Sequence, residues 1–64
     1  MTRAQFQKKV EVAKKTGSAK LPAGCTLYFH GYWCGISQGF TIEAPDGNVI
    51  VFTHDPMREA DLFE

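Results

Sequence analysis

The sequence lacks most of the features that identify a small functional domain. Two cysteines in 64 residues are too few for the disulfide scaffold of a small secreted protein, which usually carries about four or more. No apolar run approaches the roughly 18 residues that a membrane span needs. The N-terminus runs into a charged amphipathic segment, without the apolar core of a signal peptide. We therefore expect a cytoplasmic protein with reduced thiols and no membrane association.

The length limits where an activity can lie. We expect residues 1–64 to form one small domain. A domain of this size buries only about 60% of the surface of its unfolded chain, which leaves no room for a deep enclosed pocket. The apolar content of 44%, with 12% aromatic residues, is enough for a folded core. Any activity is then expected on an outer surface.

The net charge is zero, but the charged residues are unevenly distributed along the chain. Residues 1–24 carry six lysine or arginine side chains and one glutamate, a balance of +5. Residues 25–64 carry six aspartate or glutamate side chains and one arginine, a balance of −5. A bipolar chain favours a charged partner at either end without identifying it.

A β-hairpin over residues 39–54 is the clearest structural pattern. Pro45, Asp46 and Gly47 supply the fixed φ, the side-chain acceptor and the positive φ of a tight turn. Folding back at this turn sets Phe40 opposite Phe52 and Ile42 opposite Ile50 on the inner face, and Thr41 opposite Val51 and Glu43 opposite Val49 on the outer face. A slip of one residue would exchange the two faces of the last strand.

Two further segments precede the hairpin. Residues 3–16 are predicted to be a helix, because Thr2 and Gln5 have the spacing of a capping box and Gly17 suits the position after its last turn. Its apolar stripe is Phe6, Val10 and Ala13. Residues 25–34 are predicted to be a strand, with Leu27 and Phe29 on one face, Tyr28, His30 and Tyr32 on the other, and a bulge at Gly31.

The remaining segments complete an α+β fold. Residues 18–24 are predicted to be a connector, and residues 35–39 a loop that leads into the hairpin. Asp55 and Pro56 suit the start of a short C-terminal helix. We expect an N-terminal helix packed on a three-stranded antiparallel β-meander, followed by this short helix, in the order α-β-β-β-α.

This order of elements resembles two kinds of RNA-handling protein, the double-stranded-RNA-binding domain and the small toxin ribonucleases. The toxins carry a histidine shortly before the hairpin, where this chain has Ser37, Gln38 and Gly39. The RNA-binding domains begin their last helix with lysines, where this chain has the acidic segment 55–61. The resemblance is therefore confined to the order of elements, and we assign the chain to neither family.

Metal binding and nucleophilic catalysis are not expected. Cys25, His30, Cys34 and His54 are the residue types that bind zinc, but their spacing matches no common closed site. On a regular strand His30 and Cys34 lie about 13 Å apart, which also prevents a cysteine–histidine catalytic pair. We expect no cofactor, no metal and no enzymatic activity.

The leading hypothesis is a small non-enzymatic protein that binds a protein partner and modulates it by occlusion. Inhibitors of this kind are encoded by phages and mobile elements, and a host defence nuclease complex or a polymerase is the specific target we expect. If the long helix covers one face of the sheet, the other face exposes aromatic and apolar residues of the kind that anchor interfaces. The predicted contacts are Tyr28, His30, Tyr32, Trp33, Val49 and Val51, with the acidic residues Asp55, Glu59, Asp61 and Glu64 meeting a basic groove.

Three alternatives to this hypothesis stay open. A nucleic-acid-binding module would use the strand aromatics for stacking and the cations Lys8, Lys9, Lys14, Lys15 and Lys20 for phosphate. A homodimer would bury the same aromatic face. The C-terminal segment could instead fold across that face within one chain.

Overall fold

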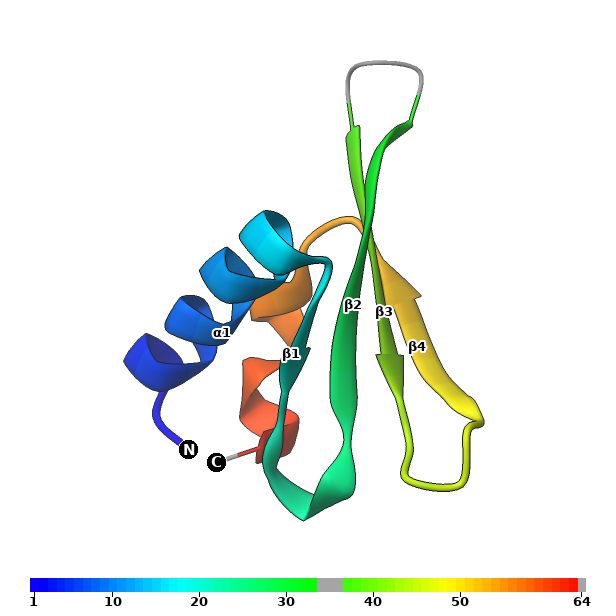
Figure 1. The fold of residues 1–64 in the computed structure, drawn as a ribbon. Helices are drawn as coiled ribbons and strands as arrows, with labels where there is room; N and C mark the ends of the chain where they lie inside the picture. Colours follow the sequence, from blue (N-terminus) through cyan, green and yellow to red (C-terminus); the bar gives the residue numbers. More distant parts are fainter. Residues whose placement is uncertain (34–36, 64) are drawn as a thin grey trace.

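The protein is an α+β domain with a four-stranded antiparallel sheet (Figure 1). The computed structural model describes residues 1–33 and 37–63, and of residues 32, 33, 37 and 38 it describes only the backbone. The elements are α1 (Arg3–Thr16), β1 (Ser18–Lys20), η1 (Pro22–Gly24), β2 (Thr26–Trp33), β3 (Ser37–Glu43), β4 (Val49–Thr53) and η2 (Pro56–Phe63), where η denotes a 3₁₀ helix. The strands follow one another in the sheet in chain order, so β1 and β4 are its edges.

Helix α1 begins and ends where its sequence predicts. The Gln5 amide donates to Thr2 Oγ1 at 3.2 Å, and the Thr2 amide donates to Gln5 Oε1 at 2.9 Å, which completes the capping box. Gly17 ends the helix with φ of 97°, and its amide donates to the Ala13 carbonyl at 2.7 Å. The predicted stripe of Phe6, Val10 and Ala13 is the buried face of the helix.

The first edge strand was not predicted from the sequence. Residues Ser18–Lys20 pair with β2 instead of forming a connector, and Ala19 lies opposite Leu27. Three residues are too few to produce a recognisable alternation of polar and apolar side chains. The predicted loop at residues 35–39 is also wrong in part, because β3 begins at Ser37. The sheet therefore has four strands where three were expected.

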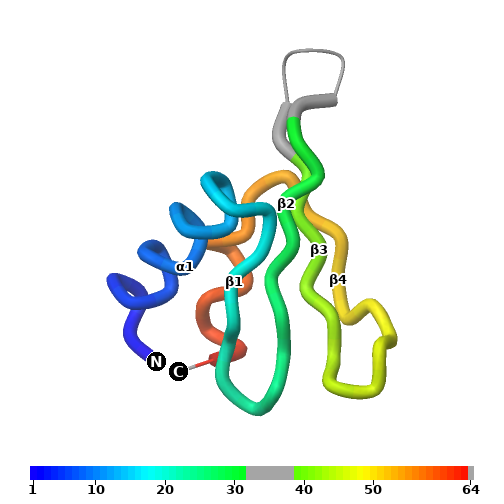
Figure 2. The backbone as a smooth tube through the Cα atoms, in the orientation of Figure 1, coloured from blue at the N-terminus to red at the C-terminus, as the bar shows by residue number. Residues whose placement is uncertain are grey.

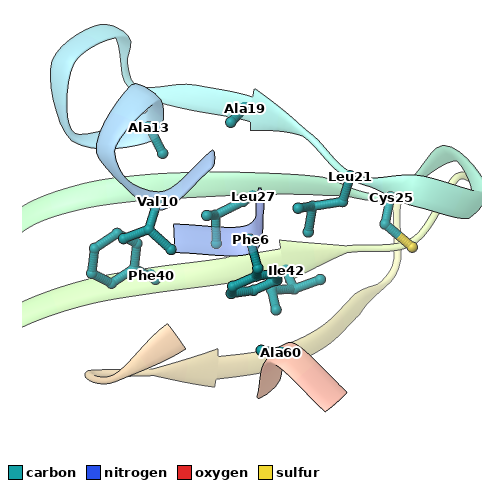
Figure 3. Packing of buried hydrophobic residues seen from close by; sticks show 10 residues of the cluster. All are labelled: Phe6, Val10, Ala13, Ala19, Leu21, Cys25, Leu27, Phe40, Ile42 and Ala60. Carbon is teal, nitrogen blue, oxygen red and sulfur yellow. The ribbon is translucent and has the colours of Figure 1, made fainter. Parts of the chain in front are cut away.

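The core lies between one face of the sheet and the two helical segments. Phe6, Leu27, Phe40 and Ile42 are fully buried, and Figure 3 shows helix side chains directed at the inner side chains of the sheet. Cys25 belongs to this core and is a buried free thiol. Strand β2 keeps Leu27 and Phe29 on the inner face as predicted, and its ladder with β3 shifts between Phe29 and Tyr32, where Gly31 adopts φ of 84°.

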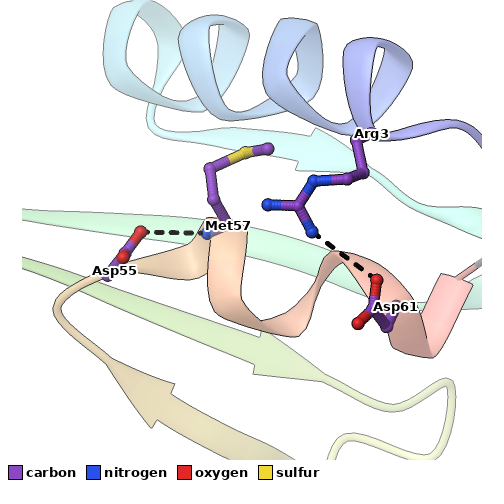
Figure 4. Close-up of polar contacts among 4 residues, drawn as sticks. All are labelled: Arg3, Asp55, Met57 and Asp61. Atoms are coloured by element: carbon purple, nitrogen blue, oxygen red, sulfur yellow. Dashed lines mark hydrogen bonds and ion pairs between the residues drawn. The ribbon is translucent and has the colours of Figure 1, made fainter.

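The C-terminal segment packs beside α1, and the two chain ends lie close together (Figure 2). The Met1 ammonium group donates to the Phe63 carbonyl at 2.7 Å, and the rings of Phe6 and Phe63 stack at 5.7 Å. Asp55 Oδ1 accepts from the Met57 amide at 3.3 Å, as expected for a capping residue, and Arg3 lies 3.5 Å from Asp61 (Figure 4). These contacts hold η2 against the helix, away from the outer face of the sheet.

The turn between β3 and β4 forms at the predicted residues. The Gly47 amide donates to the Ala44 carbonyl at 3.0 Å, and Gly47 adopts φ of 91°. The Asn48 amide donates to Asp46 Oδ1 at 3.0 Å, and the Asn48 side chain donates to Oδ2 at 2.9 Å. Both bonds lower the pKa of the Asp46 carboxyl below its ordinary value of 3.8, and the bond from the Asn48 amide has the larger effect.

The predicted register beyond that turn is wrong. Glu43 lies opposite Val49 as expected, but Ile42 then pairs with Val51, Thr41 with Phe52 and Phe40 with Thr53. Ile50 is thus an extra residue on β4, a β-bulge that reverses the faces of the residues after it. Val51, expected on the outer face, packs against the core, whereas Phe52 and Ile50, expected inside, are exposed.

A close contact between two turns gives a testable prediction. A Cβ on Gly24 would lie 2.9 Å from Pro45 Cγ, and Gly24 has φ of +79°; Gly17 has φ of +97° with nothing within 4 Å. Both Gly24→Ala and Gly17→Ala should lower the free energy of unfolding by about 1–2 kcal/mol, because alanine is disfavoured in the left-handed backbone conformation. Gly24→Ala should lower the free energy of unfolding by about 1 kcal/mol more, because its added methyl group would clash with the Pro45 ring. Urea unfolding of both variants measures the difference, and equal losses would contradict the contact.

Candidate interaction surface on the outer face of the sheet

The outer face of the sheet is the side that α1 and η2 leave uncovered. Because side chains on paired strands share a face, the register places Ser18, Tyr28, Thr41 and Phe52 in one row across all four strands. A second row contains Lys20, Thr26, Glu43 and Val49. This face is therefore polar and basic at the β1 edge and apolar at the β4 edge.

Two histidines flank Phe52 in this surface. The ring of His30 stacks on the ring of Phe52 with centroids 6.3 Å apart, and His54 meets it edge to face at 5.6 Å. His30 Nε2 and Thr41 Oγ1 lie 2.6 Å apart and share a hydrogen bond, which satisfies the buried threonine hydroxyl. The Phe52 ring is thus held in a fixed position although 42% of the residue is exposed.

Strand β4 exposes more apolar surface than any other strand of the described part. Val49 is 60% exposed and Ile50 is 48% exposed, beside Phe52. No charged residue occurs between Asn48 and His54. Natural edge strands usually carry charges, proline or a covering segment that prevents pairing with other chains. We refer to Val49, Ile50 and Phe52 as the β4 apolar strip.

The structure separates the residues that were predicted to contact a partner. Tyr28 is half-buried and His30 is exposed, both on the outer face, as expected, and Val49 is exposed there too. Val51 faces inward, so its predicted placement is wrong. The backbone of Tyr32 and Trp33 continues β2, but their side chains, like Cys34 and Glu64, lie outside the described residues.

The acidic residues do not join this face. Glu59 and Asp61 lie on η2, in the helical layer, and Asp61 is paired with Arg3. Asp55 is exposed directly after His54, but its side chain caps the start of η2. Ile50 and Phe52 are the members of the surface that sequence reasoning missed, because all four residues from Val49 to Phe52 are apolar and no polar residue marks the outer positions.

The lysines proposed for nucleic-acid binding do not lie together on one surface. Lys8, Lys14 and Lys15 are exposed on α1, whereas Lys9 and Lys20 line a shallow pocket together with Tyr28. Within the described residues, no group of three histidine, cysteine, aspartate or glutamate side chains is placed to hold a metal ion. In the same part of the chain, no helix has the length and apolar character to cross a bilayer.

Comparison of the chain with protein-family models, with curated proteins and with solved structures found no match.

Proposed function

We propose that this chain is a small non-enzymatic protein that binds a protein partner through the outer face of its sheet and modulates it by occlusion. The β4 apolar strip is the observation that carries the proposal. Exposed apolar patches with a polar surround are typical of interaction sites, and aromatic residues dominate their energetics. The rings of His30 and His54 already hold Phe52 in place, so binding costs little side-chain entropy.

The alternatives receive less support from the arrangement of the described residues. The C-terminal segment contacts α1, so it does not cover the outer face. A nucleic-acid surface needs cations beside the strand aromatics, but four of the five lysines lie on α1, and of these only Lys9 lines the pocket that Tyr28 also lines. Binding of a host machine such as a defence nuclease complex or a polymerase, as by inhibitors that phages encode, is the specific form of the proposal.

Affinity capture with matched variants tests the proposal. The immobilised chain is exposed to a bacterial lysate in nuclease-treated and untreated halves, using wild type, Phe52→Asp and Leu62→Asp. Leu62 is 61% exposed on η2, so its substitution adds the same charge away from the sheet. We expect a stoichiometric protein that survives nuclease, binds Leu62→Asp normally and binds Phe52→Asp at least about 30-fold more weakly.

Three results would contradict the proposal. Bound protein that disappears after nuclease treatment would favour the nucleic-acid alternative. Equal retention by wild type and Phe52→Asp, with both chains folded, would remove the β4 apolar strip from the interface. A mass that doubles with concentration and returns to the monomer in Phe52→Asp would identify a second copy of the chain as the partner.

A further inference from the structure

We infer that the shallow pocket at the β1 edge is a binding site for a phosphate group on a small ring-bearing ligand. The pocket has a volume of about 370 Å³ and lies where α1 and β1 run side by side, on the edge of the sheet opposite β4 (Figure 1). Its lining comes from three elements: Lys9, Val12, Ser18, Ala19, Lys20, Thr26 and Tyr28. The inference does not depend on the proposed function, which concerns the other edge.

The charged residues that line the pocket are all positive. Lys9 and Lys20 supply two ammonium groups from different elements, and no carboxylate lines the pocket. Neither lysine forms an ion pair with a described side chain. The ion pair found among the described residues joins Arg3 and Asp61. Because both lysines line the pocket, a bound dianion there would be attracted by two positive charges.

Hydroxyl groups provide additional donors. Ser18, Thr26 and Tyr28 place their side chains on the outer face beside Lys20, and within the described residues their hydroxyls have no protein partner. A phosphate has three terminal oxygens and accepts many hydrogen bonds, whereas a carboxylate has two. The number of donors therefore fits phosphate better than carboxylate.

The backbone of β1 adds amides at the same edge. The Phe29 amide donates to the Gly17 carbonyl at 3.0 Å and the Leu21 amide donates to the Cys25 carbonyl at 2.9 Å, so the odd-numbered residues of this segment face β2. Ser18 and Lys20 then direct their backbone groups toward the open edge. The Thr16 hydroxyl lies 2.8 Å from the Ser18 carbonyl and 2.9 Å from the Val12 carbonyl, so the two share its one proton. The amides of Ser18 and Lys20 and the Lys20 carbonyl are directed to the same edge.

The pocket is larger than a phosphate ion, and its remaining walls indicate what accompanies the phosphate. The volume falls within the range of about 300–1,000 Å³ that is typical of small-molecule sites. Half-buried Tyr28 adds an aromatic ring to the lining, and the exposed side chain of Val12 adds an aliphatic one. A ligand with one phosphate and one ring uses both parts, whereas two lysines are too few to follow a nucleic-acid backbone.

Titration of the intact chain followed by amide NMR tests the inference. The probes are phenyl phosphate, inorganic phosphate, benzoate and a short single-stranded oligonucleotide. We expect phenyl phosphate to bind most tightly of the four and to shift the amides of residues 18–20, 26 and 28. The double variant Lys9→Gln with Lys20→Gln should bind it about tenfold or more weakly, and the matched pair Lys14→Gln with Lys15→Gln, which removes the same charge outside the pocket, about twofold at most.

Each other outcome would overturn the inference. Equal weakening by the two pairs of substitutions would mean general electrostatic attraction. Benzoate binding as tightly as phenyl phosphate would remove the preference for phosphate, and tightest binding of the oligonucleotide would indicate a nucleic-acid surface. Shifts outside the pocket, or none at millimolar phenyl phosphate, would mean that the pocket is not a site. Retained capture of a protein partner in that case would leave the proposed function intact.

Discussion

Substituting Phe40 with alanine is expected to leave most of the chain unfolded at room temperature. Phe40 is fully buried on the central strand β3, and its ring lies 5.0 Å from that of Phe29. Truncating a buried phenylalanine to alanine costs about 3–5 kcal/mol through lost transfer energy and the remaining cavity. A single core in a chain this short rarely supplies more than about 3–5 kcal/mol of stability. The loss is therefore comparable with the whole free energy of unfolding.

Urea unfolding monitored by circular dichroism measures this effect, and Phe52→Ala is the matched control. Phe52 is the same residue type, one strand away, but on the outer face. Its truncation should cost about 1 kcal/mol or less, as is usual for substitutions at the surface. Similar losses for the two variants would contradict the burial of Phe40 relative to Phe52.

The second large effect is expected from a charge placed on the inner face of β4. Val51→Asp should lower the free energy of unfolding by about 2–4 kcal/mol, because Val51 packs against the core and a carboxylate there has no partner. Phe52→Asp should change it by about 1 kcal/mol or less, because its position is open to solvent on the outer face. Thermal unfolding of the two variants makes the comparison. A larger loss for Phe52→Asp would support the register without the bulge at Ile50.

Local signals made α1 and the β3–β4 turn predictable. The cap at Thr2, the stop at Gly17 and the turn at Pro45–Gly47 depend on the conformational preferences of a few adjacent residues. Such preferences do not depend on long-range contacts, so they can be predicted from the sequence alone. The α+β class followed from them.

The rest of the fold depends on contacts that no local pattern encodes. Strand β1 is three residues long and forms because Ala19 completes the core beside Leu27. The bulge at Ile50 is equally invisible, since either register of the segment Val49–Phe52 presents apolar side chains to the core. Once the bulge is fixed, Phe52 reaches the outer face and comes between His30 and His54.

The unpredicted strand β1 and the unpredicted bulge at Ile50 also caused errors in the predicted surfaces. Without the bulge, Val51 takes the outer position that belongs to Phe52, so of the two β4 residues predicted to face outward Val49 does so and Val51 does not. Without β1, Lys20 has no defined place, and its proximity to Lys9 and Tyr28 across the sheet edge does not follow from the sequence. In both cases the error lies in strand pairing rather than in residue chemistry.

The most direct test of the account is the pairing of β3 with β4 in solution, because the position of the β4 apolar strip depends on it. Nuclear Overhauser contacts between backbone protons of the two strands report this pairing. The structure predicts contacts that join Thr41 with Phe52 and Ile42 with Val51. Contacts that instead join Ile42 with Ile50 and Phe40 with Phe52 would place Phe52 in the core and contradict the proposed interaction surface.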